Sequence, residues 1–309
     1  MKALNGIVDI VNNLGVLPGS EIVLVQGSAS GAELFAFNDP NSRSVAGIGQ
    51  MNEGIEGLDV TVGLKLSFVR AILKAPKFDL AKTLMSVSHN NGKAPMLKVI
   101  TERSQHNIAL MEQRLAEECV TALKLNPVTY QLTLRPTADG IQQFKHWNRE
   151  QSAMIGQEVR FWPNVNGRGR LNFQFDHGMA IAQMMQFEFA RGFPPVRLVP
   201  YTYPAQEVLA VLGLYSTSES LTMSFSNKGV LTIDVDSGLG KYKFHFGGGK
   251  DMIYRTDQIE KWSEVWELER IAIEDTVISS DFDPVDFHEN GGPNPLAGRY
   301  LIDGPAYRW

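Results

Sequence analysis

The sequence predicts an α+β protein built from two tandem units, each with antiparallel sheets and two helices. Two observations lead to this fold class. Short runs of alternating apolar side chains, separated by Gly, Asn and Asp turn signals, are typical of antiparallel strands. The order helix, strands, helix, strands then occurs twice, which indicates duplication of a unit of roughly 125 residues.

The first unit is predicted to begin with an amphipathic helix over residues 1–16, because Leu4, Ile7, Val11 and Leu14 follow helical spacing. A second helix is expected over 65–76, where the pattern stops at Pro76. Its predicted apolar face holds Leu64, Phe68, Val69, Ile72 and Leu73. Strands are expected at 21–27, 33–37, 44–49, 58–64, 83–89, 96–102, 108–115 and 118–125.

The second unit follows a connector at 125–137 that contains two prolines. Thr137 is placed to cap a helix over 138–151, and Pro204 is placed to open another over 204–215. Strict alternation of apolar residues over 220–246 indicates three antiparallel strands at the end of the unit. Further strands are expected at 157–163, 170–176, 180–190 and 196–201.

Composition indicates a folded cytoplasmic protein. The chain has 309 residues, of which 43% are hydrophobic. No run of about 18 apolar residues and no secretory leader pattern occurs, so we expect no membrane partner and a cytoplasmic location. The single cysteine, Cys119, excludes an internal disulfide and a thiolate metal cluster, and we expect it to belong to the core.

Charge is unevenly distributed along the chain. Residues 251–309 hold 5 of the 29 basic and 13 of the 34 acidic residues, so this segment has a net charge of −8. Residues 1–250 hold the other 24 basic and 21 acidic residues and are mildly basic. Such a body is compatible with a nucleic-acid partner if the cations gather on one face.

Two tandem units of this layout resemble the DNA sliding clamps, including T4-type phage clamps and proliferating cell nuclear antigen. The resemblance covers roughly residues 1–250, and its most telling part is the strand run SESLTMSFSNKGVLTIDVDSGLGKYKFHF. It implies clamp-like domains at 1–125 and 126–250, followed by an acidic, aromatic-rich extension at 251–309. It further implies a non-enzymatic ring, here a homotrimer, that encircles duplex DNA without a cofactor and tethers the replicative polymerase after loading by a clamp-loader ATPase.

A clamp that slides needs cations that face phosphates without reading bases. Helical geometry places Arg70 and Lys74 opposite the apolar face of their helix, and Lys145 opposite the stripe formed by Ile141 and Phe144. The helices at 1–16 and 204–215 are poor in cations. The expected DNA-facing residues are Lys2, Lys65, Arg70, Lys74, Lys77, Gln142, Lys145, His146, Arg149, Arg168 and Arg170. The alternative for each is an ordinary solvated side chain.

The resemblance also places a partner pocket beside the connector. An apolar anchor of the polymerase would dock there. The residues expected to receive it are Leu123, Leu125, Pro127, Val128 and Tyr130. The alternative is that they are core residues flanking a linker. Segment 251–309 is expected to fold back onto its own subunit or a neighbouring one, with its acidic groups outside the hole.

An enzyme is not favoured, because the six histidines lack ligand-like spacing and the run Gly247-Gly248-Gly249-Lys250 lacks the rest of a phosphate-binding loop. Asp176-His177 and the acids from Asp281 to Asp286 form no established catalytic pattern. Two alternatives to a ring-forming clamp stay open. One is a viral structural protein of the capsid or tail, and the other is a clamp-like processivity protein that does not close a ring.

Overall fold

The structure is a computed structural model. It describes residues 1–37, 45–75, 78–89, 95–116, 127–155, 158–175 and 185–250. The chain divides into two units, Met1–Thr256 and Asp257–Trp309. The described residues all belong to the first of these units. The predictions made for Lys77, Cys119, Leu123, Leu125 and the segment 251–309 therefore lie outside them.

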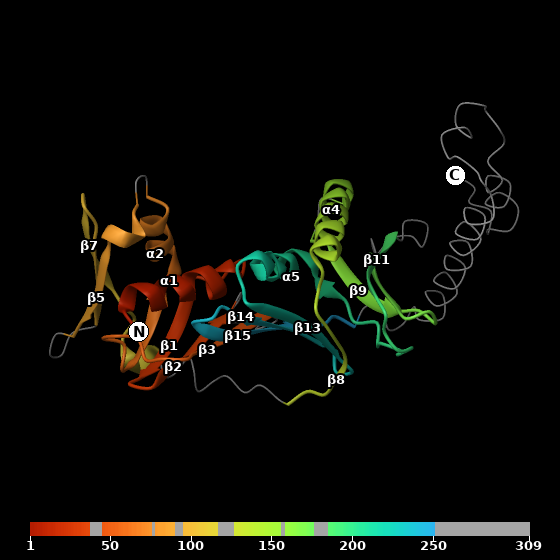
Figure 1. Cartoon of the computed structure of the whole chain (residues 1–309), viewed down its shortest axis with the longest axis horizontal. Helices are drawn as coiled ribbons and strands as arrows, with labels where there is room; N and C mark the ends of the chain where they lie inside the picture. Colours follow the sequence, from red (N-terminus) through yellow and green to blue (C-terminus); the bar gives the residue numbers. More distant parts are fainter. Residues whose placement is uncertain are drawn as a thin grey trace, which may run out of the picture. The chain divides into compact units, whose positions relative to one another are not determined.

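Besides a helical stretch at 113–116, the first half of the described chain contains two longer helices, seven strands and two short 3-10 turns (Figure 1). In chain order these are α1 (Ala3–Asn13), η1 (Leu14–Val16), β1 (Ile22–Ser28), β2 (Gly31–Phe37), β3 (Val45–Met51), β4 (Thr61–Lys65), α2 (Leu66–Leu73), η2 (Leu80–Lys82), β5 (Leu84–Ser88), β6 (Met96–Ile100) and β7 (Gln105–Ala109).

The second half repeats this order, with one additional strand in front of its first helix. Its elements are β8 (Tyr130–Leu134), α4 (Ala138–Ile155), β9 (Arg160–Val165), β10 (Arg170–Phe175), β11 (Met185–Arg191), β12 (Tyr203–Pro204), α5 (Ala205–Leu212), η4 (Gly213–Ser216), β13 (Ser220–Ser226), β14 (Val230–Asp236) and β15 (Gly240–Gly247).

The strands form three antiparallel sheets. The largest has the order β4-β1-β2-β3-β15-β14-β13-β8, so it combines strands from both halves. The other two have the orders β11-β10-β9-β12 and β5-β6-β7. The predicted α+β class with antiparallel sheets and two helices per half is therefore confirmed.

The two halves match element by element. The helix α2 begins at Leu66 and α5 at Ala205, which is 139 residues later, and β1 begins at Ile22 and β9 at Arg160, which is 138 residues later. Even the isolated bridge between Gly63 and Met111 recurs as the bridge between Thr202 and Gly249. These matching elements of the two halves are thus 138 or 139 residues apart.

Pairing of β3 with β15 joins the halves. Seven residue pairs, from Gly240 opposite Met51 to Phe246 opposite Val45, continue the sheet across the joint. Gly47 is required there, because a Cβ at this position would lie 2.8 Å from a methyl carbon of Leu14 and 3.3 Å from the ring of Phe244. Residues of helix α1, of the strands and of the joint therefore belong to one hydrophobic core.

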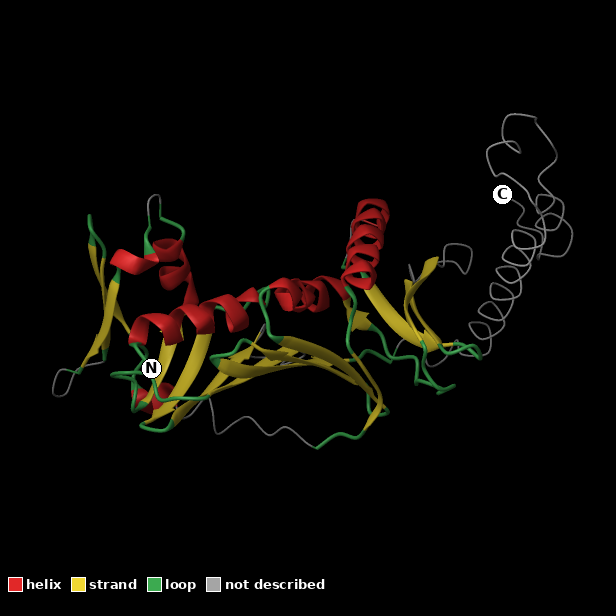
Figure 2. Ribbon diagram, in the orientation of Figure 1, coloured by secondary structure: helices red, strands yellow, loops and turns green. Residues whose placement is uncertain are grey.

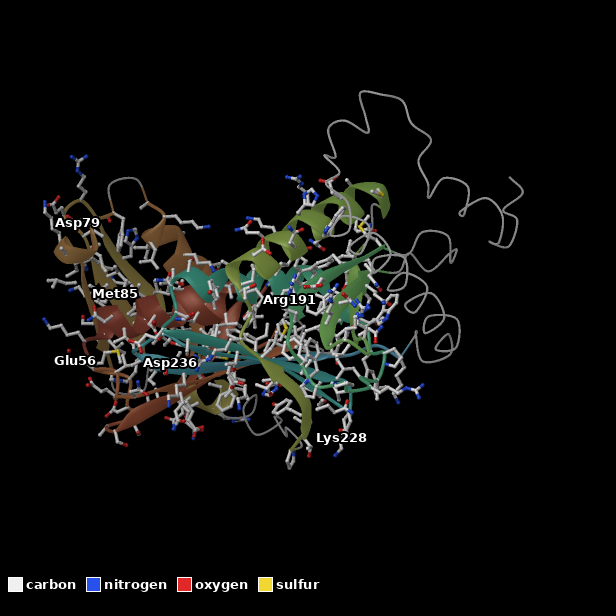
Figure 3. All side chains as sticks on the ribbon, turned by 45° about the vertical axis from the view of Figure 1, so that its right-hand side comes forward. Glu56, Asp79, Met85, Arg191, Lys228 and Asp236 are labelled. Carbon is white, nitrogen blue, oxygen red and sulfur yellow. The ribbon has the colours of Figure 1, made fainter. Side chains whose placement is uncertain are left out.

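Hydrogen bonds to helix α1 also stabilise the joint between β3 and β15. The carboxylate of Asp9 on α1 accepts hydrogen bonds from the Tyr242 hydroxyl at 2.5 Å, the Ser237 hydroxyl at 2.9 Å and the Asn13 amide at 3.0 Å. In Figure 3, Asp236, the residue before Ser237, lies close to the first elements of the chain, and Lys228 lies far from them. Asp9 thus ties the first helix to the last two strands.

Aromatic side chains fill the core of the second half. The ring of Phe144 on α4 is 4.8 Å from that of Phe161 on β9 and 5.2 Å from that of Phe173 on β10, both edge-on. All three side chains are fully buried. Helix α4 begins where the sequence predicts, because the Thr137 hydroxyl accepts a hydrogen bond from the Gly140 amide at 3.1 Å.

Four local predictions were wrong. The strand expected at 108–115 was misplaced, since β7 spans Gln105–Ala109 and residues 113–116 are helical. The connector contains strand β8, although prolines border it. Residues 196–201 form no strand, since two prolines precede them and Pro200 removes a backbone donor. Phe68 is 53% exposed, because the helix starts at Leu66 and turns Leu66, Val69 and Ile72 inward instead.

The joint predicts a specific pH dependence. Burial raises the pKa of Asp9 above its ordinary value of 3.8, and hydrogen bonds from Tyr242, Ser237 and Asn13 only partly oppose this. The folded protein therefore holds the Asp9 proton more tightly than the unfolded chain, so the free energy of unfolding falls as pH rises from the ordinary pKa through the raised one. Urea unfolding at several pH values should show this decline relative to Asp9→Asn. Asp139→Asn on the surface serves as the charge control, and a wild-type stability that rises relative to Asp9→Asn over this window would contradict the assignment.

Candidate nucleic-acid interface

Helices α1, α2, α4 and α5 gather on one side of the sheets (Figure 2). Helices α1 and α5 lie over the same face of the eight-stranded sheet, α2 packs beside α1, and α4 packs beside α5. Most side chains predicted to meet DNA belong to these helices or to the residues that flank them.

Helix α2 presents two exposed lysines at its ends. Lys65 precedes the helix, and its ammonium lies 5.1 Å from the ring centre of the exposed Phe68. Lys74 follows the helix and is exposed. Arg70, which the helical spacing grouped with Lys74, is only partly exposed, and its guanidinium donates a hydrogen bond to the Gly15 carbonyl. Arg70 therefore also anchors the turn after α1.

Helix α4 separates apolar from polar residues as the sequence predicts. Ile141 and Phe144 are buried, and Trp147 packs against the same core. The exposed residues of the opposite face include Gln142, Lys145, His146 and Arg149. The guanidinium of Arg149 donates to the Glu150 carboxylate at 2.8 Å, and this pair lowers the pKa of Glu150. Lys145 is thus the cation of this face for which the structure shows no acidic neighbour among the described residues.

Helices α1 and α5 add little charge. Lys2 is exposed just before α1, whose other exposed residues are Asn5 and Asn12. Helix α5 carries no cation, and burial raises the pKa of its half-buried Glu207. The paucity of cations expected on these two helices is therefore present in the structure.

The hairpin arginines differ from each other. Arg168 is exposed in the turn between β9 and β10. Arg170 lies 3.6 Å from the Glu188 carboxylate, and both side chains are about 15% exposed. Alternation along β10 turns Phe173 toward α4 and Arg170 toward the opposite face of the sheet. The predicted contact of Arg170 with DNA gains no support from this geometry, because Arg170 lies on the face of its sheet that points away from α4. The predicted contact of Arg168 with DNA stays a prediction.

The described end of the connector is held against the sheet. Pro127 is exposed, whereas Val128 and Tyr130 are half-buried. The Tyr130 hydroxyl donates to the Thr232 hydroxyl at 2.9 Å, which in turn lies 3.1 Å from Nδ1 of His245. Burial, and secondarily the charge of Lys243, lowers the pKa of His245. This chain of contacts spans β8, β14 and β15, and no spacing in the sequence reveals it.

The parts of the chain that the structure describes contain no cluster of side chains suited to bind a metal ion. Within them no three His, Cys, Asp or Glu side chains come together as metal ligands. His89 contacts the Gly57 carbonyl at 2.8 Å and His106 the Ser104 hydroxyl at 2.9 Å. Among the same residues no helix has the length and apolar character needed to cross a membrane.

Comparison with known proteins identifies the fold. The sequence matches no protein family and no curated protein. The structure is similar to PCNA from Thermococcus kodakaraensis, with a TM-score of 0.54 and 11% sequence identity over 80% of this chain and 97% of that one. It is also similar to Proliferating Cellular Nuclear Antigen from Entamoeba histolytica, with a TM-score of 0.51 and 10% identity over 78% of this chain and 93% of that one. The predicted clamp fold is confirmed.

The contacts of α2 predict that its two cations differ in their effect on stability. Arg70→Ala should lower the free energy of unfolding by about 1–2 kcal/mol, because it leaves the Gly15 carbonyl without a charged donor. Lys74→Ala should change it by less than about 0.5 kcal/mol, since Lys74 is exposed at the helix end. Urea unfolding of both variants measures the difference, and equal decreases would show that Arg70 does not anchor the turn.

Proposed function

We propose that this chain is a sliding clamp, which closes into a ring around duplex DNA and tethers the replicative DNA polymerase as a processivity factor. The proposed role is that of a non-enzymatic scaffold. The observation that carries it is the joint between β3 and β15, because it is a head-to-tail contact between two copies of one repeat.

Repetition of that joint between chains supports a ring. The counterpart of β3 in the second half is β11, and the counterpart of β15 in the first half is β7. Among the described strands β11 pairs only with β10, and β7 only with β6. We propose that β11 of one chain pairs with β7 of the next. A head-to-tail contact of this kind closes a ring when its rotation permits, and three chains would supply six repeats.

The helix face supplies the proposed contact with DNA. Lys65, Lys74 and Lys145 are exposed on or beside α2 and α4, as are Lys2 before α1 and Gln142, His146 and Arg149 on α4, and Arg70 is partly exposed. Flexible lysines attract phosphates as point charges and read no base, which is what sliding requires. Exposed neutral residues between the cations leave the attraction weak enough for movement along the duplex.

Partners and domain limits follow as further parts of the proposal. The polymerase would dock at the connector, where Pro127, Val128 and Tyr130 are the described members of the predicted pocket, and a clamp-loader ATPase would open the ring. The two clamp units would meet near residues 125 and 126, with the extension beginning near 251. The site of action would be the cytoplasm, or that of the host if the protein is viral.

Retention on circular DNA tests the proposal. A closed ring loaded on nicked circular DNA stays linked to it, whereas it slides off the ends of the same DNA after linearisation. We expect retention on the circle alone at about 0.5 M salt, where a screening length of roughly 4 Å removes most surface attraction. Equal dissociation from both forms would contradict encirclement and would favour the structural or non-ring alternatives.

Charge removal tests the DNA-facing surface. The double variant Lys74→Ala and Lys145→Ala should bind DNA more weakly, and the slope of its binding against salt should be shallower by about one for each lysine that no longer meets a phosphate. The matched control is Lys228→Ala with Lys241→Ala, which removes the same charge from exposed positions outside the helices. Equal effects of the two pairs on fluorescence anisotropy titrations would refute the assignment.

A further inference from the structure

Among the described strands, β5 lacks a neighbour that its counterpart β13 possesses. In the second half, β13 pairs with β14 on one side and with β8 on the other. In the first half, β5 pairs with β6, and no described strand lies along its outer edge. The isolated bridges at Met111 and Gly249 occupy equivalent positions in the two halves. When the strand pairings are followed back from these bridges, Met85 on β5 corresponds to Met223 on β13.

Side-chain exposure reflects this difference. Met223 is fully buried, and Leu134 of β8 lies opposite it. Met85, labelled on β5 in Figure 3, is only half-buried although it faces the core. Its neighbour Leu84 is 69% exposed, and Leu80 in the preceding turn is 45% exposed. Met85 therefore keeps apolar surface exposed that its counterpart Met223 buries, and Leu84 and Leu80 add further exposed apolar surface near this edge.

The edge also lacks the usual protection against strand pairing. Edge strands are commonly blunted by charges, prolines or bulges. Lys65 lies in β4, Glu188 and Arg191 lie in β11, Pro204 lies in β12, and a register shift interrupts β8. The sequence of β5, Leu-Met-Ser-Val-Ser, contains no such feature. Among the described edge strands, only β7 also contains no charged residue, proline or bulge, and the proposed ring would cover it.

We propose that the outer edge of β5 binds an extended segment of a partner protein by strand addition. The pattern of β8 defines the chemistry of this segment. In β8, Leu132 and Leu134 are buried while Gln131 and Thr133 are exposed, and none of the five residues is charged. A neutral segment with apolar side chains at alternate positions would donate and accept main-chain hydrogen bonds along β5 and cover Met85 with one apolar side chain.

The loop before β4 limits how much of β5 is available for pairing. Gly57 adopts a φ of 77° and lies so close to β5 that a Cβ on it would be 3.0 Å from Cβ of Val87. His89 contacts the Gly57 carbonyl at 2.8 Å and fixes this loop. The added segment therefore pairs with Leu84–Ser86 and ends at Gly57. The site does not depend on the proposed function, since ring closure would use β7 and β11.

A tethered donor strand tests the site directly. Residues 129–136 of this protein, Thr-Tyr-Gln-Leu-Thr-Leu-Arg-Pro, are joined through a short Gly-Ser linker to Met1 of the full chain, which raises their effective concentration near β5. The matched control carries lysine in place of both leucines of the appended segment. Hydrogen exchange at Leu84–Ser86 is then measured in both fusions and in the unmodified chain.

The donor fusion should slow exchange at Leu84–Ser86 by about tenfold relative to the lysine control, without changing the number of chains per particle. Equal exchange in the two fusions would overturn the proposal. Protection that is present in the unmodified chain and grows with protein concentration would also overturn it, because a second copy would then occupy the edge. Neither readout involves DNA, so failure here is distinguishable from failure of the clamp function.

Discussion

Pairing of β3 with β15 is the contact on which the described structure depends. It joins strands almost two hundred residues apart, and it turns two four-strand layers into one sheet that carries α1 and α5 on the same face. Gly47 lets Leu14 and Phe244 approach across the joint, while Asp9 receives hydrogen bonds from Tyr242 and Ser237 on the far strands. Because apolar packing and a half-buried carboxylate meet there, the two halves should unfold together.

The pairing of β3 with β15 within one chain also suggests how separate chains could assemble. When two similar repeats meet through unlike surfaces, the complementary surfaces lie at the two ends, and these are the edges of β7 and β11, which pair with no further strand among those described. A ring built this way places every α1, α2, α4 and α5 on equivalent faces. Cations that are sparse on one chain, such as Lys74 and Lys145, would then recur around a closed path, so a modest net charge is compatible with DNA binding.

Much of the fold was predictable because it is encoded locally. Alternation over 220–246 located β13, β14 and β15, and Thr137 located the start of α4. Long-range facts were not predictable: the joint of β3 with β15 and the bond from Arg70 to Gly15 depend on residues far apart in the chain. Strand β8 was missed because prolines border a strand that its pairing with β13 stabilises. In the candidate site, helical spacing identified Lys145 on an exposed face but misjudged Phe68, whose helix begins later than the apolar pattern suggested.

The solution mass, measured by light scattering over a range of protein concentrations, tests the central claim that this chain closes a ring through its repeat joint. The account predicts a discrete particle of three chains, each of 34.3 kDa, whose mass does not grow further as concentration rises. A chain that stays monomeric at every concentration, or that assembles into particles of increasing size, would contradict closure of a three-chain ring.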